Sequence, residues 1–268
     1  MSLAAAIHAE LGETLYRALR ERSALPPITK THPDVTVEDA YHISRAMLAL
    51  RCTRDGERIV GKKIGVTSAA VQQMLGVFQP DFGFLTDAMA VADGGIIPAS
   101  STLIAPRAEV EIAFRLAQTL SGTNNTEETV LAATECILPC FEIVDSRIAN
   151  WQIAIQDTIA DNASCGVYVL GASEIDPRGV DLAALRIDLY KNGAPLSSGL
   201  GSAVQGNPLT AVAWLANTLG AFDIDLEAGE IILSGSVVPL EPVQAGDSLR
   251  LEMSGDDIPT CGATCAFS

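Results

Sequence analysis

The stretch Pro106-Arg-Ala-Glu-Val-Glu-Ile-Ala-Phe-Arg-Leu116 alternates polar and apolar side chains with the period of a β-strand. Its apolar face consists of Val110, Ile112, Phe114 and Leu116. Glu109 and Glu111 share the opposite face, where their side chains leave the backbone roughly 6.5–7 Å apart. That separation suits two long carboxylates that converge on one cation. The other interpretation is a solvated strand face on which Glu111 pairs with Arg107 or Arg115.

Similar short runs, bounded by Gly, Pro and Asp, occur throughout the chain after Gly56. Alternation and β-branched composition predict strands at 58–66, 108–116, 137–144, 166–170, 185–191, 230–233 and 248–253. Helices are predicted at 68–75, 126–136 and 208–219, with Gly220 as the residue that directly follows the last one. Strands outnumber helices and do not alternate strictly with them. This pattern favours a mixed, β-rich α/β body over a doubly wound sheet.

The first part of the chain is different, because its apolar residues recur at helical spacing. One stripe consists of Ile7, Leu11, Leu15 and Leu19. A second helix is expected to begin at Thr36, whose hydroxyl can cap the amide of Asp39. We therefore divide the chain into a helical N-terminal part, residues 1–55, and a β-rich body, residues 56–268.

Composition limits the classes of partner. Acidic residues outnumber basic ones by 33 to 17 in a chain of 268 residues, so the formal net charge is -16. Such a surface repels phosphate backbones and anionic membranes. No apolar run approaches the roughly 18 residues that span a bilayer, and the first residues lack the basic segment of a secretory signal. The six cysteines are spread through a long chain, so we expect a reduced, cytoplasmic protein.

The positions of histidine limit the chemistry. His8, His32 and His42 all lie in the helical part, and the body contains none. A Ser-His-Asp or Cys-His nucleophile, or a zinc site of the histidine type, would need the N-terminal part to supply its imidazole. The body alone must use Lys, Asp, Glu, Tyr, Cys or bound water for acid–base work. Any metal there is expected to be hard and bound by oxygen, as Mg²⁺ and Mn²⁺ are.

A third carboxylate strengthens the metal interpretation. Glu142 lies in the apolar run Pro139-Cys-Phe-Glu-Ile-Val-Asp145, where a buried charge without a partner would be costly. Either a basic residue or a bound cation should compensate it, and three carboxylates are a normal Mg²⁺ set. Asp145 is either a supporting group for that site or a helix N-cap.

Two adjacent lysines fall on opposite faces of the predicted strand at 58–66. Lys62 shares its face with Val60 and Ile64, whereas Lys63 lies between Gly61 and Gly65, where a ligand can approach the backbone. Lys63 is therefore the candidate for substrate binding or proton transfer. The alternative is that both lysines are solvated ends of an edge strand.

Five motifs occur in order: Gly61-Lys-Lys-Ile-Gly-Val-Thr-Ser68, Leu75-Gly-Val-Phe-Gln-Pro-Asp-Phe-Gly83, Pro106-Arg-Ala-Glu-Val-Glu111, Cys140-Phe-Glu-Ile-Val-Asp-Ser-Arg147 and Ala160-Asp-Asn-Ala-Ser164. Together they resemble the 2-hydroxypenta-2,4-dienoate (2-oxopent-4-enoate) hydratases of the fumarylacetoacetase superfamily, over about residues 37–253. The resemblance implies a fumarylacetoacetase-like β-roll body with Mg²⁺ or Mn²⁺ held by Glu109, Glu111 and Glu142. The catalytic residues it implies are Lys63 and Asp81, and the substrate-binding residues are Arg107, Asp161, Asn162, Ser164 and Gly201.

By the same resemblance, the protein adds water to 2-hydroxypenta-2,4-dienoate and yields 4-hydroxy-2-oxopentanoate in the meta-cleavage degradation of aromatic compounds. Such enzymes are homo-oligomers, often associated with 4-oxalocrotonate decarboxylase. That decarboxylase activity is the first alternative, although Arg107 and the pair Lys62-Lys63 resemble the hydratases more. A non-catalytic partner subunit of a hydratase–decarboxylase complex is the second alternative. The segment 256–268, with Cys261 and Cys265, is unlike the usual ending of these enzymes, and the sequence predicts no element for it.

Overall fold

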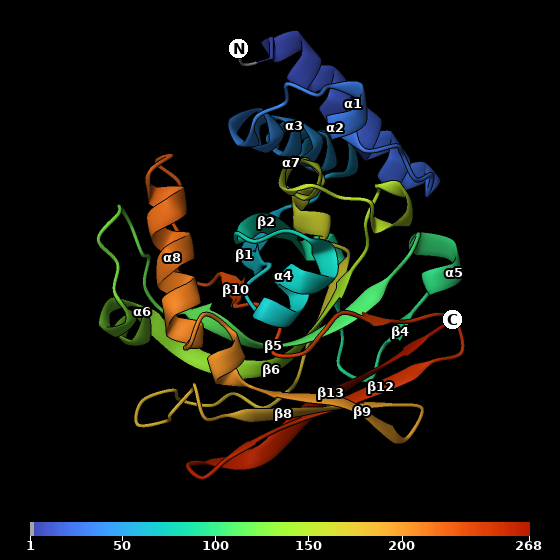
Figure 1. Ribbon diagram of the computed structural model, residues 1–268. Coiled ribbons are helices and arrows are strands. Elements are labelled where there is room, and N and C mark those ends of the chain that lie inside the picture. The colour runs from blue at the N-terminus through green and yellow to red at the C-terminus, as the bar shows by residue number, and fades with distance from the viewer. Residues whose placement is uncertain (1–2) are drawn as a thin grey trace.

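Strand β5 (Arg107–Leu116) lies inside a curled sheet of eight strands, the central layer of the molecule in Figure 1. The computed structural model describes residues 3–268 of the chain. The sheet runs in the order β2 (Asp81–Thr86), β1 (Ile59–Gly65), β10 (Ile231–Leu233), β5, β6 (Thr134–Val144), β7 (Val167–Leu170) and β3 (Ala90–Val91). The short strand β11 (Glu241–Pro242) pairs with the start of β5.

A second sheet of five strands lies below the first in Figure 1 and packs against the apolar face of β5. Its order is β4 (Ile96–Ile97), β13 (Ile258–Phe267), β12 (Ser248–Gly255), β8 (Arg186–Lys191) and β9 (Ala194–Leu200). The buried cluster between the sheets contains Val110, Ile112, Leu189, Leu251 and Phe267. The mixed, β-rich α/β fold predicted from the sequence is confirmed, and the segment 256–268 is now explained, because it forms β13.

The N-terminal helices form the upper layer of Figure 1 and consist of α1 (Ala5–Glu21), α2 (Ile28–Thr31) and α3 (Val37–Asp55). The predicted start of α3 is confirmed: the amide of Asp39 donates to Oγ1 of Thr36 over 3.1 Å. The core of this layer also contains Ile148 and Ile159, and Ile159 belongs to helix α7 (Ile155–Ala160) of the body. The two parts of the chain therefore share one apolar core.

The other helices are α4 (Ala69–Leu75), α5 (Ala99–Thr102), α6 (Glu127–Ala133) and α8 (Pro208–Gly220). The short 3₁₀ turns are η1 (Asp87–Met89), η2 (Ala149–Trp151), η3 (Asn162–Ser164) and η4 (Gly201–Ala203). Two predicted helix ends are wrong. The helix predicted at 126–136 stops at Ala133, because the residues from Thr134 onward pair with β5. Gly220 is the last residue of α8 rather than the residue after it, and a side chain there would meet the carbonyl oxygen of Gly122.

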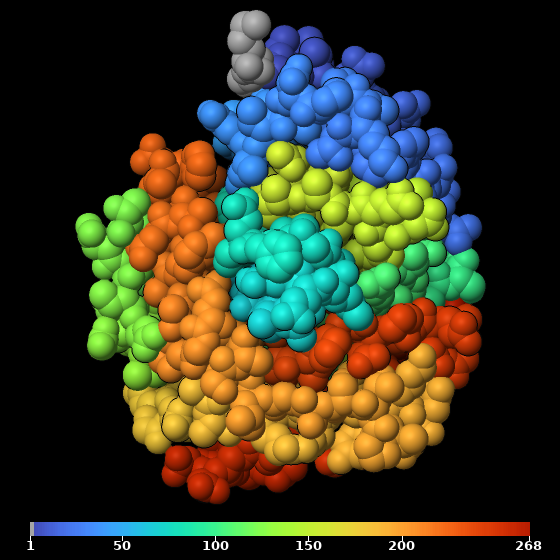
Figure 2. Space-filling view, in the orientation of Figure 1, coloured from blue at the N-terminus to red at the C-terminus, as the bar shows by residue number. Residues whose placement is uncertain are grey.

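The segment around α4 covers the centre of the face shown in Figure 2, where it lies between α8 and the residues near α7. Val71 and Leu75 of α4 point into a cavity beneath this cover. Among residues 3–268, no helix has both the length and the apolar content required to cross a bilayer. The fold thus places a covered cavity beside the polar face of β5.

Candidate active site

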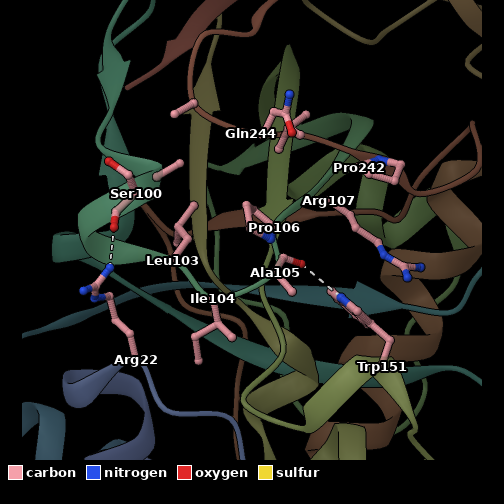
Figure 3. A pocket seen from close by; sticks show the side chains of 13 residues that line it. Arg22, Ser100, Leu103, Ile104, Ala105, Pro106, Arg107, Trp151, Pro242 and Gln244 are labelled. Carbon is pink, nitrogen blue, oxygen red and sulfur yellow. Dashed lines mark hydrogen bonds between the residues drawn. The ribbon is translucent and has the colours of Figure 1, made fainter.

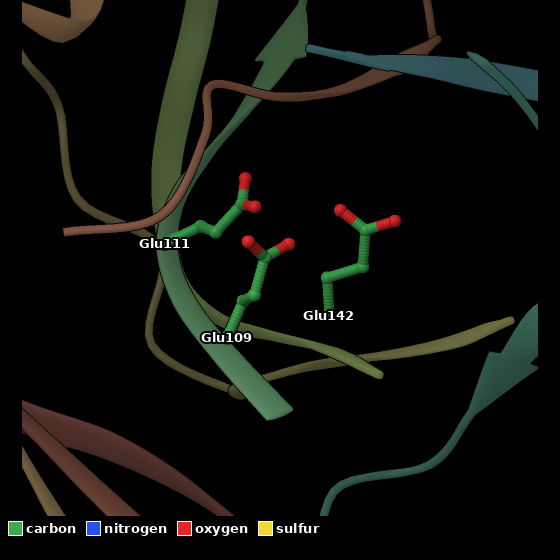
Figure 4. A group of neighbouring side chains, drawn as sticks. All are labelled: Glu109, Glu111 and Glu142. Carbon is green, nitrogen blue, oxygen red and sulfur yellow. The ribbon is translucent and has the colours of Figure 1, made fainter. Parts of the chain in front are cut away.

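Three glutamates from neighbouring strands converge at the polar face of β5. The antiparallel register sets Glu109 opposite Glu142 of β6, and Glu111 follows two residues along on the same face. Each of the three offers a carboxylate oxygen that lies within 4.8 Å of the others, and all three side chains are buried. Figure 4 shows the three carboxylates directed toward one another. The interpretation of this face as solvated is therefore wrong.

The electrostatics of the cluster call for a cation. Burial, together with the charge of Glu142, raises the pKa of Glu109 to about 8. Burial also raises the pKa of Glu111 and of Glu142. One oxygen of Glu111 and both oxygens of Glu142 have no hydrogen-bond partner among the described residues. Orphaned, buried carboxylate oxygens are the donor set that a hard divalent cation requires, so these residues fit such an ion.

The glycine that follows β10 holds the third ligand in place. The amide of Gly235 donates to Oε2 of Glu111 over 2.7 Å. Gly235 has a φ of 109°, which favours glycine, and a side chain there would collide with Thr67. Neither residue was singled out from the sequence. The signal available was the short Leu233-Ser-Gly-Ser236 turn directly after a β-run.

Adjacent lysines in β1 serve different carboxylates. Nζ of Lys63 lies 3.4 Å from Oε1 of Glu142, inside the cluster. Lys62 points to the other face and contacts both oxygens of Glu230 at 2.6 and 2.5 Å. β1 lies between β2 and β10, and both lysines are buried. The predicted split of faces is confirmed, and the alternative of solvated strand ends is wrong.

Lys63 is a cation among acids. Burial by itself lowers the pKa of this amine, but Glu142 and the neighbouring acidic groups more than reverse that effect. The net result is a pKa above the ordinary value of lysine. A protonated Lys63 therefore supplies one positive charge to a cluster of three carboxylates.

Asp81 begins β2 directly beside this cluster. Oδ2 of Asp81 accepts a hydrogen bond from Oγ1 of Thr158 at 2.9 Å, whereas Oδ1 has no hydrogen-bond partner in the part of the chain that the structure describes. Burial raises the pKa of Asp81, and Lys63 opposes that shift. A side chain at Gly65 would lie 2.1 Å from Oδ1, so this glycine leaves the space that Asp81 occupies.

Lys63, Asp81 and Glu109 share a small cavity of about 20 Å³. Thr158 and Ser164 complete its polar wall, and its apolar wall consists of Val66, Val71, Leu75, Val144, Trp151, Ile153, Ala163 and Leu240. Four residues that line it have left-handed backbone, namely Val66, Trp151, Ala163 and Ser164, with φ of 58°, 54°, 49° and 53°. Strained backbone of this kind concentrates at functional sites, because the surrounding structure must hold it in place.

Two of the predicted substrate-binding residues have internal partners instead of facing the cavity. The carboxylate of Asp161 forms a buried ion pair with Arg147, and its pKa is raised to about 6 because burial outweighs the attraction of that guanidinium. The side-chain amide of Asn162 is bonded to β2: its Oδ1 accepts from the backbone amide of Phe84, and its Nδ2 donates to the carbonyl oxygen of Phe84. Both side chains fix the turn that presents Ser164.

Three other predicted positions lie away from the cavity. Gly201 packs in η4, where a side chain would lie 1.9 Å from the carbonyl oxygen of Leu182. Arg107 lies at the outer end of β5, over the ring of Trp151 (Figure 3). Asp145 accepts from the amides of Ile104 and Ala105, so it supports the turn before β5 and is not a helix N-cap.

Comparison with known proteins agrees with this geometry. Residues 37–265 match the family model for the fumarylacetoacetate (FAA) hydrolase C-terminal domain. A 2-hydroxyhexa-2,4-dienoate hydratase from Comamonas testosteroni is 60% identical over 93% of this chain and 94% of its own length. A 2-hydroxypent-2,4-dienoate hydratase from Pseudomonas putida is 58% identical over 80% of this chain and 96% of its own. A 2-keto-4-pentenoate hydratase from Paraburkholderia xenovorans is 45% identical over 92% and 91%.

Among solved structures, a 4-oxalocrotonate decarboxylase from Pseudomonas putida G7, complexed with magnesium and adipate, superposes with a TM-score of 0.92. It is 32% identical, and the match covers 99% of both chains. A fumarylpyruvate hydrolase from Pseudomonas aeruginosa, in complex with Mn²⁺ and pyruvate, shares the fold at a TM-score of 0.59 and 14% identity. With a buried carboxylate triad, a matching family model and hydratases at 45–60% identity, the chain belongs to the fumarylacetoacetate hydrolase family, in its branch of 2-keto-4-pentenoate hydratases.

Proposed function

We propose that this protein is a divalent-metal-dependent hydratase that converts 2-hydroxypenta-2,4-dienoate to 4-hydroxy-2-oxopentanoate in the meta-cleavage degradation of aromatic compounds. The observation that carries the proposal is the buried triad of Glu109, Glu111 and Glu142 with Lys63 beside it. Relatives named as hydratases of this acid and of its six-carbon analogue share most of their length with this chain. None of the three histidines lines the cavity, which disfavours water activation by imidazole.

The triad would hold Mg²⁺ or Mn²⁺ through its orphaned carboxylate oxygens. A bound divalent cation would stabilise negative charge on the C2 oxygen of a 2-oxo or 2-enol acid. The lysine next to the triad adds a fixed positive charge, and we propose that Nζ of Lys63 binds the C1 carboxylate or the enol oxygen of the substrate.

Asp81 is the proposed proton carrier, because it lines the cavity and its Oδ1 has no hydrogen-bond partner within residues 3–268. The dienol loses its hydroxyl proton and gains a proton at C5, which gives a 2-oxo-3-enoate whose C4 is electrophilic by conjugation. Water then adds its oxygen to C4, and C3 takes the remaining proton. The apolar wall around Val71 and Leu240 excludes bulk water, so the water that adds to C4 is expected to be a single molecule held in position by the polar wall.

The remaining proposed binding roles follow from position. Ser164 lines the cavity and can contact the substrate directly. Asp161 and Asn162 act on the substrate through the turn that they brace. Gly201 remains a proposed substrate-binding position, although its place in this chain is explained by close packing against Leu182.

Product analysis tests the reaction. Purified protein with Mg²⁺ is expected to convert 2-hydroxypenta-2,4-dienoate to 4-hydroxy-2-oxopentanoate and to release little CO₂ from 2-oxohex-3-enedioate. A chelator should abolish turnover, and Mg²⁺ or Mn²⁺ should restore it. The structural similarity to a 4-oxalocrotonate decarboxylase makes decarboxylation the second candidate. Rapid CO₂ release without water addition would establish that activity instead.

We further propose that the chain assembles with copies of itself. Among residues 3–268, seven large apolar side chains are exposed to solvent: Ile59, Met74, Phe78, Ile96, Leu196, Leu200 and Phe222. Contiguous patches of exposed apolar groups are typical of surfaces buried by association, and Met74 and Phe78 lie only four positions apart in the segment around α4. Light scattering coupled to size exclusion is expected to give a mass that is a multiple of one chain, whereas a monomeric mass would contradict the proposal.

A further inference from the structure

An open groove on the surface and the buried cavity have one residue in common, Trp151. The groove has a volume of about 670 Å³, and Figure 3 shows Arg107 and Trp151 together at one side of it, with Arg22 at the other. The indole Nε1 donates to the carbonyl oxygen of Ala105 over 3.0 Å. The Trp151 side chain therefore stands between solvent and the cavity that holds Lys63 and Glu109.

The groove differs in charge from the rest of the protein. The chain carries a formal charge of -16, yet the residues that line the groove include Arg22 and Arg107 and no aspartate or glutamate. Within residues 3–268, no carboxylate lies within ion-pair distance of Arg107. A groove with uncompensated guanidinium groups in an acidic protein concentrates small anions.

Arg107 is held at the boundary by contacts that leave its charge available. Its guanidinium lies 4.6 Å from the centre of the Trp151 ring, and Nη1 lies 3.7 Å from the sulfur of Met74 on α4. On β5, Arg107 shares a face with Glu109, two residues and roughly 6.5–7 Å further along the strand. One strand therefore carries a guanidinium group that lines the groove and a carboxylate that lines the cavity.

The buried cavity must open before a substrate can enter. Its volume of about 20 Å³ has room for about one water molecule, and a five-carbon acid is several times larger. The turn that carries the indole is strained, since Asn150 and Trp151 both have positive φ, at 57° and 54°. Strained residues of this kind cluster at active sites, ligand clamps and switch regions.

We propose that Arg107 and Trp151 form a doorway that admits small carboxylic acids: the acid binds Arg107 from the groove, and Trp151 then swings aside to let it pass along β5. This inference rests on the proposed function, because it takes a 2-oxo or 2-enol acid as the ligand. Arg107 thus binds the substrate before the substrate reaches the triad. Arg107 is therefore a binding residue of the entrance and not of the reacting centre.

Exchange of ¹³C-labelled 2-oxopentanoate, measured by NMR with Mg²⁺ present, tests the doorway without any turnover, because this acid has no carbon–carbon double bond to which the enzyme could add water. Arg107→Gln is expected to lower the association rate constant at least about tenfold and to weaken its dependence on ionic strength. Arg17→Gln on α1 is the matched control, since it removes the same charge from an exposed site outside the groove, and it should stay within twofold of the parent. Equal rate constants for the two variants would overturn the proposal.

Trp151→Ala is expected to raise both the association and the dissociation rate constants of 2-oxopentanoate at least about fivefold, and unchanged rates would show that the indole is not the door. A second readout uses fluorescence, because the chain has two tryptophans and Trp214→Phe leaves Trp151 alone. The emission maximum of Trp151 should shift on addition of 2-oxopentanoate, and an unchanged emission spectrum would contradict the doorway. If the parent protein has no hydratase activity but gives these binding responses, the proposed function is refuted and the doorway is not.

Discussion

Lys62 and Lys63 are neighbours in sequence, yet each neutralises a different buried acid. Removal of Lys63 takes a positive charge from the substrate cavity, so Lys63→Ala should lose at least about two orders of magnitude in kcat at saturating Mg²⁺. Removal of Lys62 leaves Glu230 buried without its partner, so Lys62→Ala should keep kcat within a few-fold but lose about 3 kcal/mol of stability. Steady-state kinetics and urea unfolding measure both effects. Equal losses of turnover, or the reverse order, would refute this assignment.

The carboxylate cluster makes the stability of the metal-free protein depend on pH. In the folded state the pKa of Glu109 is raised to about 8, above its unfolded value, and those of Glu111 and Glu142 are raised as well. At a pH between the unfolded and the folded pKa of each carboxyl group, the folded state binds more protons than the unfolded chain. The free energy of unfolding therefore falls as pH rises through that range. In EDTA, the urea midpoint should therefore drop from pH 5 to pH 8, and saturating Mg²⁺ should remove the drop.

The matched control for this titration is Glu109→Gln, which removes the group with the pKa of about 8 and keeps its size. Its metal-free stability should fall less steeply over the same pH range. A parent protein whose stability in EDTA is flat or rises from pH 5 to pH 8 would contradict the raised pKa values.

At the residue scale, alternation within a strand was sufficient to predict which face Glu109, Glu111 and Lys63 occupy. The partners of Asp161 could not be predicted in the same way. Its carboxylate reaches Arg147 across irregular turns, and no periodicity relates the two positions. The same limit applies to Trp151, whose proposed role depends on the position of its side chain between the surface groove and the buried cavity.

At the scale of elements, the strand β13 shows where local pattern is insufficient. Residues 258–267 contain Pro259, Gly262 and two cysteines, which obscure the alternation of a strand. Its position is nevertheless central, because β13 pairs with both β12 and β4. Strands with strong local alternation, such as β5 and β1, were predicted within a residue or two, whereas β2, β9 and β13 depend on their neighbours in space.

Phe267 at the end of β13 is buried in the core between the sheets. Phe267→Ala should therefore lower the free energy of unfolding by about 3 kcal/mol, because it opens a cavity that the strands cannot close. Thr260→Ala on the exposed side of the same strand is the control and should change stability by less than about 0.5 kcal/mol. Urea denaturation followed by circular dichroism measures both, and similar values for the two variants would contradict a core role for β13.

At the scale of the whole molecule, the N-terminal helices cover apolar side chains of the body that no other part of the body covers. Ile148 and Ile159 of the body complete the helical core, and Oγ1 of Thr29 donates to Asp157 of α7 over 2.7 Å. The division at residue 55 therefore separates elements that depend on one another. The sequence predicted both parts, because each has its own periodicity, but periodicity within one part does not reveal an interface between the two.

Residues 56–268 expressed alone should therefore accumulate in an insoluble form, or in one that binds a hydrophobic dye, without hydratase activity. Co-expression with residues 1–55 should restore soluble, active protein, since the missing apolar face is then supplied in trans. Sedimentation, dye fluorescence and turnover measure these outcomes. A soluble body fragment with the activity of the full chain would show that the N-terminal helices are dispensable.

Strand β5 carries proposed metal ligands on one face and core residues on the other. This arrangement restricts which changes of sequence the protein can accept during evolution. Inserting or deleting one residue early in β5 would exchange its two faces, so that Val110 and Ile112 would enter the cavity and Glu111 the core. Point substitutions can alter this strand one face at a time, but changes of length cannot. Diversification of substrate range is thereby directed to the loops and to the cover around α4, where insertions leave the parity of β5 intact.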